Sequence, residues 1–345
     1  MKTKTVIKKW QLLWHRSDAP AVDLREAEFL SVGNRAFRRC RGSMEEIRLP
    51  EGLSAIKSEA FRGCRRLFSV RLPEDSDVGL GTGALRDCIR LREIAPFERI
   101  SSIGERAFSG CTMLSQISFG AGLRRIGAYA FRDCASLRSV TVPAHLESIG
   151  KGAFLQCTEL ERVEIEEGVT HLAPAMLRGC ISLGDIRIPS TVTALEEDLL
   201  RDCSALSSIA LPGSVQQVGK NALRGCRRLR EVRMELGVSA IGAGAFRDCP
   251  ELREIYLPHS IKRLGFAAFG LGRAEERTRI YVEQEYMVRR MKRMLLLCGS
   301  YGRVEVLQSG KTIEERKRER RRSTLEKKVV RLTDAPDEKK DQVEP

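Results

Sequence analysis

Residues 134–157 of the chain read CASLRSVTVPAHLESIGKGAFLQC, and this pattern returns along most of the sequence. The first two intervals between successive pattern cysteines are 24 residues long, and the other seven are 23. A fixed period of this length is typical of a solenoid, in which copies of one small unit stack and bury a continuous core. The period therefore predicts the architecture before any motif is considered. The pattern cysteines are Cys40, Cys64, Cys88, Cys111, Cys134, Cys157, Cys180, Cys203, Cys226 and Cys249.

A strand is predicted shortly after each cysteine. In the quoted stretch, Leu137, Val140 and Val142 lie three, six and eight residues after the first cysteine. From the second unit onward the first of these positions is always Leu and the second always Ile or Val. Proline often follows the third, as Pro143 does here. Alternation of this kind is typical of a short strand that proline then ends. One such strand per unit predicts a long parallel sheet.

The second half of each unit is expected to bend the chain back into the core. It carries another apolar pair, here Leu146 and Ile149, followed by Gly150 and then by residues 153–154, Ala-Phe. Glycine at this position fits a close backbone approach or an unusual φ angle. The last stretch predicts a short helical turn that returns the phenylalanine and the next cysteine to the core.

Composition indicates which residue types form the core and which partners the charge favours. The chain is 42% hydrophobic but only 6% aromatic, so aliphatic side chains must form most of the core. Its formal net charge is +14, from 60 basic and 46 acidic residues. Such a balance favours nucleic acid, anionic lipid or acidic proteins as partners, although a general preference for arginine would produce the same charge. No apolar run approaches the roughly 18–20 residues of a membrane span. The first residues also lack an apolar signal-peptide region, so we expect a cytoplasmic protein.

The repeated cysteines are predicted to be buried thiols. Each occupies the same packing position of its unit, where a free cysteine behaves as a small hydrophobic residue. Parallel strands lie about 4.8 Å apart, so disulfides between neighbouring units are geometrically possible. The missing export signal favours thiols instead. No C-x-x-C spacing, clustered histidines or catalytic triad occurs, and we therefore expect no metal, no cofactor and no enzymatic activity.

The full pattern, Cys-x-x-Leu-x-x-Ile-x-Leu-Pro-x-x-Val-x-x-Ile-Gly-x-x-Ala-Phe-x-x-Cys, resembles the BspA-type leucine-rich repeat over about residues 22–272. The resemblance implies a curved, right-handed repeat solenoid of about 10–11 repeats, with mostly short parallel strands and short helical turns. The resemblance also implies a role in adhesion or protein binding. Many members of this family are secreted or attached to the cell surface. The resemblance thus keeps open a surface adhesin that is exported by a route not visible in the sequence.

Four segments are predicted. Residues 1–21 form an N-terminal cap, with Val6, Trp10, Leu13 and Trp14 at helical spacing, or alternatively a helix that lies on a membrane. Residues 22–272 form the solenoid, and its first unit is degenerate. Residues 273–308 form a C-terminal cap of strand, helix and strand, whose basic helix could instead bind a membrane or a partner. Residues 309–345 form a basic tail, partly helical and then disordered.

Two surfaces are candidates for binding. The outward positions of the predicted strands vary most, and repeat proteins commonly bind partners on such a face. The residues proposed to bind a protein partner there are Arg71, Arg162, Arg187, Arg233 and Tyr256. A second set lies two residues before the cysteines and would form a positive stripe for an anionic partner. These residues are Arg62, Arg86, Arg132, Arg178, Arg201, Arg224 and Arg247.

The function favoured by the sequence is a non-enzymatic scaffold that binds a protein partner on the sheet face. The main alternative is a binder of an anionic polymer, such as nucleic acid, or of a membrane surface. That alternative would use the arginine stripe together with the basic tail.

Overall fold

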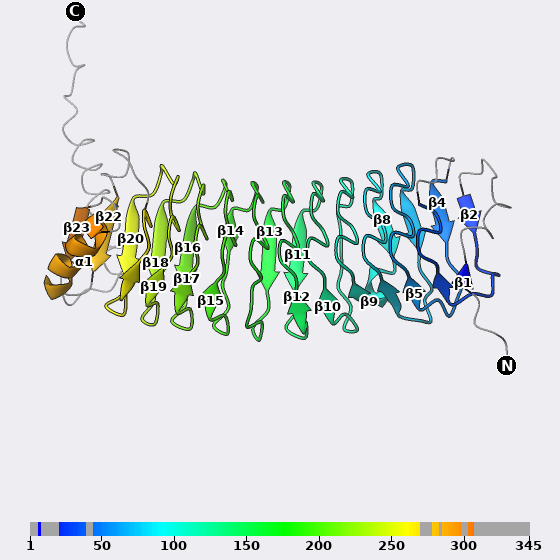
Figure 1. The fold of residues 1–345 in the computed structure, drawn as a ribbon, viewed down its shortest axis with the longest axis horizontal. Coiled ribbons are helices and arrows are strands. Elements are labelled where there is room, and N and C mark those ends of the chain that lie inside the picture. Colours follow the sequence, from blue (N-terminus) through cyan, green and yellow to red (C-terminus); the bar gives the residue numbers. More distant parts are fainter. Residues whose placement is uncertain are drawn as a thin grey trace, which may run out of the picture.

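The computed structural model describes residues 6–7, 21–38, 44–269, 278–282, 285–297 and 303–306. Successive coils of the chain stack side by side into a long rod, with the N-terminal coils at one end and helix α1 at the other (Figure 1). Every strand pairs in parallel with the equivalent strand of a neighbouring coil. The predicted repeat solenoid is therefore confirmed.

The predicted strand after each cysteine builds one face of the rod, called the first face below. Its hydrogen-bonded ladder is interrupted at residues 116–118, which form no strand, and again between β14 and β16. The strands of the first face are β2 (Ala21–Asp23), β4 (Glu46–Arg48), β6 (Ser69–Arg71), β8 (Glu93–Ala95), β11 (Ser139–Val142), β13 (Arg162–Ile165), β14 (Asp185–Ile186), β16 (Ser208–Leu211), β18 (Glu231–Met234), β20 (Glu254–Leu257), β22 (Arg279–Val282) and β23 (Arg303–Val306).

A second face of short strands was not predicted. The apolar pair that precedes the repeated glycine pairs with the same position of the next coil, so each unit contributes up to two strands instead of one. Most of these strands have only two residues, which is too short for a recognisable alternation. They are β1 (Val6–Ile7), β3 (Ser31–Val32), β5 (Ala55–Ile56), β7 (Val78–Leu80), β9 (Ile100–Ile103), β10 (Arg125–Ile126), β12 (Ser148–Ile149), β15 (Ala194–Leu195), β17 (Gln217–Val218), β19 (Ala240–Ile241) and β21 (Arg263–Leu264), and one 3-10 turn, η2 (Phe97–Arg99), precedes β9.

The core lies between the two faces and follows the sequence pattern. In β11 the side chains of Val140 and Val142 are buried, whereas the polar residues between and before them are exposed. The phenylalanines of neighbouring coils stack, and the ring centroids of Phe108 and Phe131 lie 5.2 Å apart with an angle of 6° between the planes. Full burial of such side chains contributes roughly 1.5–3 kcal/mol each to the free energy of unfolding. The repeated columns are thus the source of the continuous core.

The cysteines from Cys64 to Cys249 are buried and carry free thiols, as predicted. The side chain of Cys134 is 0% exposed. Burial raises the pKa of the Cys180 thiol to about 12. Cys40 and Cys298 lie outside the described residues.

The repeated glycine is required for close packing of neighbouring coils. A Cβ atom on Gly150 would lie 2.3 Å from the backbone nitrogen of Ala128 in the preceding coil. Positive φ angles occur at other positions of the turn, for example 58° at Tyr129 and 60° at Asp133. Of the two predicted reasons for the glycine, close approach is the one that the structure shows. The expected short helical turn is a set of hydrogen-bonded turns with left-handed residues.

The two ends of the rod differ in structure. Val6 and Ile7 form the strand β1, which pairs with β3, so Val6 does not belong to a helix as its spacing with the tryptophans had suggested. Trp10, Leu13 and Trp14 lie outside the described residues.

At the other end, helix α1 (Glu285–Leu297) lies between β22 and β23 in the chain and packs against both strands and against β21. Met287, Met291 and Leu295 are buried on its inner side. Among the described residues, no helix has the length and apolar character that a membrane crossing requires. The predicted tail, residues 309–345, lies outside the described part of the chain.

Candidate functional site

A column of side chains runs along the C-terminal half of the first face, and its backbone ladder is continuous from β16 to β22. Its members are equivalent positions of successive coils. Register places Ala210 opposite Arg233, Arg233 opposite Tyr256, and Tyr256 opposite Tyr281. We call this set the sheet-face column: Arg187, Ala210, Arg233, Tyr256 and Tyr281. Three of the five residues predicted from the sequence to bind a partner belong to this column, and the strand register links two of them, Arg233 and Tyr256, directly.

A hollow opens beside Arg187, where the ladder of the first face is interrupted between β14 and β16. The cavity has a volume of about 480 Å³ and is lined by Arg187 and Ala210 of the column together with Asp185 and Ser208. The Arg187 side chain is 88% exposed and forms an ion pair with Glu167 at 3.5 Å. An exposed ion pair of this kind contributes little to stability, so the guanidinium can exchange its partner at low cost.

Glu167 is held in place from the other side of the same hollow. Its carboxylate accepts hydrogen bonds from the backbone N–H of Ser190 at 3.1 Å and from the Ser190 hydroxyl at 2.9 Å. These two hydrogen bonds hold Glu167 independently of its ion pair with Arg187.

The column continues into a stacked ladder. The Cζ atom of Arg233 lies 5.6 Å from the centroid of the Tyr256 ring, a cation–π distance. The rings of Tyr256 and Tyr281 stack at 4.9 Å with an angle of 19° between the planes. The Tyr256 hydroxyl donates a hydrogen bond to Glu254 at 2.9 Å, and burial together with this carboxylate raises the pKa of Tyr256. These contacts hold an aromatic and cationic surface in a defined conformation.

Tyr281 is the member of this ladder that sequence reasoning missed as a site residue. The strand that contains it was expected, but the interval from Tyr256 to Tyr281 is 25 residues instead of 23. Its side chain is only 4% exposed, so it supports Tyr256 from below and presents little surface of its own.

Acidic side chains accompany the column. Glu231 forms an ion pair with Arg233, and Glu254 accepts the hydrogen bond from Tyr256. Asp185 lies at the hollow beside Arg187. The surface thus carries both signs of charge.

The two remaining predicted residues are not part of the column. Arg162 lies on β13 opposite Asp185, which lines the hollow, but Arg162 itself does not line it. Arg71 lies on β6 and forms an ion pair with Glu93 at 2.9 Å. The coils of Cys88, Cys111 and Cys134 separate Arg71 from the others, so the five residues do not form one site.

The arginines of the predicted positive stripe all have carboxylate partners. Asp198 lies 3.4–3.5 Å from both Arg178 and Arg201, and Asp248 lies 2.8 Å from Arg224. Many of these acids occupy the left-handed turn positions, where Asp is tolerated better than most residues. The remaining pairs are Arg62 with Glu59, Arg86 with Asp87 at 3.5 Å, Arg132 with Asp133 at 3.0 Å, and Arg247 with Asp248 at 3.7 Å. The positive field of the stripe is therefore offset locally.

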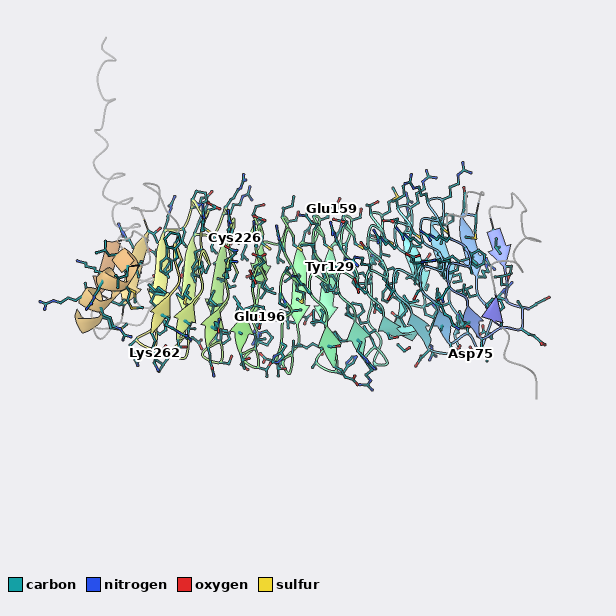
Figure 2. All side chains as sticks on the ribbon, viewed as in Figure 1. Asp75, Tyr129, Glu159, Glu196, Cys226 and Lys262 are labelled. Carbon is teal, nitrogen blue, oxygen red and sulfur yellow. The ribbon has the colours of Figure 1, made fainter. Side chains whose placement is uncertain are left out.

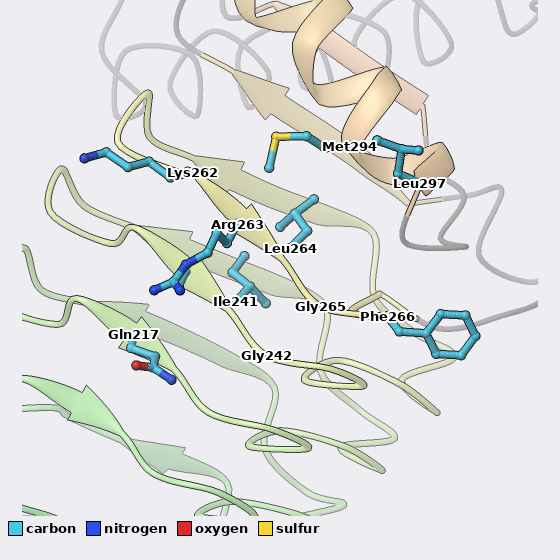
Figure 3. A pocket seen from close by; sticks show the side chains of 11 residues that line it. Gln217, Ile241, Gly242, Lys262, Arg263, Leu264, Gly265, Phe266, Met294 and Leu297 are labelled. Carbon is cyan, nitrogen blue, oxygen red and sulfur yellow. The ribbon is translucent and has the colours of Figure 1, made fainter.

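Another hollow lies where strand pairing on the second face ends (Figure 3). It has a volume of about 660 Å³ and is lined by Ile241, Leu264 and Phe266 on the rod and by Met294 and Leu297 on α1. Here α1 packs against β21, the last strand of the second face, where a further strand would otherwise pair. Within the described ranges, no group of three His, Cys, Asp or Glu residues is arranged to hold a metal ion.

Comparisons with known proteins agree with this geometry. The family model for the BspA type leucine rich repeat region matches residues 30–161, 79–206 and 147–272. A leucine rich cell surface protein of Faecalibacterium prausnitzii has a similar structure, with a TM-score of 0.53 and 20% sequence identity. The match covers 85% of this chain and 88% of that one.

Two further solved structures are similar at lower scores. A leucine-rich repeat protein of Bacteroides ovatus gives a TM-score of 0.47 and 18% identity over 84% of this chain and 92% of that one. The pneumococcal vaccine antigen PcpA gives a TM-score of 0.47 and 16% identity over 83% of this chain and 85% of that one. A comparison with curated proteins gave no match.

Proposed function

Because the chain belongs to the family of proteins with a BspA type leucine rich repeat region, we propose that it is a non-enzymatic scaffold that binds a protein partner on its first face. The proposed contact surface is the sheet-face column with the adjoining hollow. Arg162, on the neighbouring strand opposite Asp185, is proposed to contribute beside it.

The observation that carries this proposal is the hollow beside Arg187. It combines a concave surface, backbone edges at an interrupted ladder, and a guanidinium that is 88% exposed. Next to it stands the ladder of Arg233 and Tyr256, and Arg and Tyr are the residue types most often found to dominate protein interfaces. Mixed charge at the rim supports a protein over an anionic polymer.

The place of action is part of the proposal. The Faecalibacterium protein is described as a cell surface protein, and this supports the surface adhesin over the cytoplasmic scaffold as the setting of the same binding mode. Labelling intact native cells with a reagent that does not cross membranes would distinguish the two, since only a surface protein would react.

Site-specific photo-crosslinking tests the binding surface. A photoreactive amino acid at position 210 would stand in the hollow, and one at position 95 would occupy the equivalent place on β8, at the opposite end of the same face. We expect a crosslinked partner from position 210 and none from position 95. The Arg187→Ala change should weaken crosslinking without affecting folding, because its side chain is almost fully exposed. Equal crosslinking from both positions would contradict the proposal.

The triple variant Arg187→Ala, Arg233→Ala and Tyr256→Ala extends the test to the whole column. It should recover less partner in a pull-down than the wild type does. Identical recovery would remove the sheet-face column from consideration.

A further inference from the structure

One long edge of the rod is formed by the turn that follows each cysteine. Figure 2 shows Glu159, two residues after Cys157, on this edge, and shows Lys262 and Asp75 on the opposite edge. The residues one, two and four positions after the cysteines are equivalent along the rod and line the edge. We call it the turn edge.

Near the N-terminal end, the turn edge carries arginines that have no acidic partner. Arg65 and Arg66 follow Cys64, and Arg90 and Arg92 belong to the next coil; all four are exposed. Within the described part of the chain, none of them has a carboxylate within ion-pair distance, in contrast to the arginines two residues before the cysteines.

Two acids close to these arginines in the sequence are paired with other arginines. Glu93 is paired with Arg71 on the first face at 2.9 Å, and Asp87 lies 3.5 Å from Arg86. The next coil contributes Thr112 and Met113 to the turn edge, and neither is acidic. Among the described residues, no carboxylate therefore forms an ion pair with these four arginines.

Apolar side chains stand among these arginines. Phe68, Ile89 and Met113 are 41%, 40% and 41% exposed and come from three consecutive coils. Hydrogen bonds show that these turns are adjacent. The Thr112 hydroxyl donates to the Ile89 carbonyl at 3.0 Å, and the backbone N–H of Arg92 donates to the Phe68 carbonyl at 2.9 Å.

The inward position of each turn is occupied by a different residue from these three. The position that each turn sends inward is already filled by a fully buried leucine: Leu67, Leu91 and Leu114. Their exposure is thus a property of the edge and not a by-product of core packing.

We propose that this part of the turn edge binds the surface of an anionic lipid bilayer. Arg65, Arg66, Arg90 and Arg92 would contact lipid phosphates, and Phe68, Ile89 and Met113 would enter the region beneath the headgroups. Basic residues beside projecting apolar ones are the combination that holds proteins at a membrane surface. A row of turn tips along one edge can meet a flat bilayer at several points together.

Other anionic ligands fit this surface less well. A carbohydrate polyanion would leave the three apolar side chains in water. Single-stranded nucleic acid binds by stacking bases on several aromatic rings, and Phe68 is the sole aromatic residue of this set. The sheet-face column begins in the coil of Cys180 and ends on β22, so lipid binding at the N-terminal coils leaves the proposed protein site free.

Vesicle co-sedimentation with the full chain tests the proposal. The probes are phosphatidylcholine vesicles and vesicles that also contain about 30% phosphatidylserine. One variant carries Arg65→Gln, Arg66→Gln, Arg90→Gln and Arg92→Gln. Another carries Phe68→Ser, Ile89→Ser and Met113→Ser.

A matched control removes the same charge elsewhere. It carries Arg124→Gln, Lys151→Gln, Lys262→Gln and Arg263→Gln, which are exposed cations off the turn edge and likewise form no ion pair with described residues. Thermal unfolding of every variant verifies that the changes have not disturbed the fold.

We expect the wild type and the control to sediment with the anionic vesicles and not with the neutral ones. The arginine variant should bind at least about tenfold more weakly, because each basic residue near an anionic surface contributes to binding. The serine variant should also bind more weakly.

Four results would overturn the proposal. They are failure of the wild type to sediment, full binding by the arginine variant, an equal loss in the control, and full binding by the serine variant. Displacement of the protein from vesicles by a stoichiometric amount of single-stranded oligonucleotide would assign the edge to nucleic acid instead.

Discussion

The thiol of Cys134 donates a hydrogen bond to the backbone carbonyl of Phe108, 3.3 Å away in the preceding coil. The same contact, at 3.1–3.3 Å, recurs for each cysteine from Cys64 to Cys249. The Phe108 carbonyl also accepts the N–H of Cys111 within its own coil at 3.0 Å. The cysteine therefore joins each coil to the one before it. This explains why cysteine recurs at this position: it is small enough for the core and can donate a hydrogen bond.

Replacing this cysteine should loosen the stack. We expect Cys134→Ala to lower the free energy of unfolding by about 1–2 kcal/mol, through loss of packing and of the bond to the Phe108 carbonyl. Urea denaturation followed by circular dichroism measures the change. Ser136→Ala, on the turn two residues further along, is the control and should shift the midpoint very little. A Cys134→Ala protein as stable as the wild type would argue that the thiol contributes nothing beyond filling space.

The buried thiols predict a loss of stability at alkaline pH. Burial raises the pKa of Cys180 to about 12, above its ordinary value of 9.0, and raises the pKa of Cys157 and Cys203 in the same direction. The unfolded chain therefore releases these protons at lower pH than the folded chain does. Stability is fully present below about pH 9 and falls as the pH rises towards 12. Thermal midpoints measured across this range should decline, and the thiols of Cys64 to Cys249 should resist iodoacetamide at pH 8 until urea is added.

Two glycines in different environments, Gly150 beside the second face and Gly184 on the turn edge, predict a contrast between two substitutions. Gly150→Ala would place a Cβ atom 2.3 Å from backbone of the preceding coil and should lower the free energy of unfolding by roughly 1–3 kcal/mol. Gly184→Ala is the matched control, because nothing lies within 4 Å of the added atom. That change should be neutral or slightly stabilising. Equal midpoints for the two variants would show that the coils are not in close contact at Gly150.

The acids beside the arginine stripe predict a gain of anion binding when they are neutralised. Changing Asp87, Asp133, Asp202 and Asp248 together to Asn removes carboxylates that lie within 4.0 Å of stripe arginines. Asn tolerates the left-handed backbone at these positions, so the fold should persist. Retention on immobilised heparin should shift to higher salt. Unchanged retention would mean that the carboxylates do not offset the stripe.

Much of the fold could be read from the columns, but the site could not. Val140 and Val142 predict a strand because they alternate with polar residues, and the structure contains that strand as β11. The pair Ser148–Ile149 is too short to show alternation, so its strand is visible only through pairing with Arg125–Ile126 of the preceding coil. Arg187 could be placed on the outward face, yet nothing local predicts that the ladder is interrupted beside it.

Charge is where sequence reasoning was least informative. Arg178 and Arg92 look alike as exposed basic residues of a repeat. The left-handed turn brings Asp198 within 3.5 Å of Arg178, whereas the acid next to Arg92, Glu93, is paired with Arg71 of the neighbouring coil. Whether an arginine forms an ion pair depends on acids some 20 residues away in the sequence. The repeat pattern by itself does not show which of these acids lie close to it.

By itself, the sequence determined the period, the buried columns and the outward positions, because each depends on side-chain chemistry repeated at a fixed interval. Only the tertiary structure decided where the second set of strands forms, where the ladder opens beside Arg187, and which arginines are neutralised. These features arise between coils, from backbone approach and from contacts across the stack, and a solenoid creates them only when neighbouring units are placed against each other.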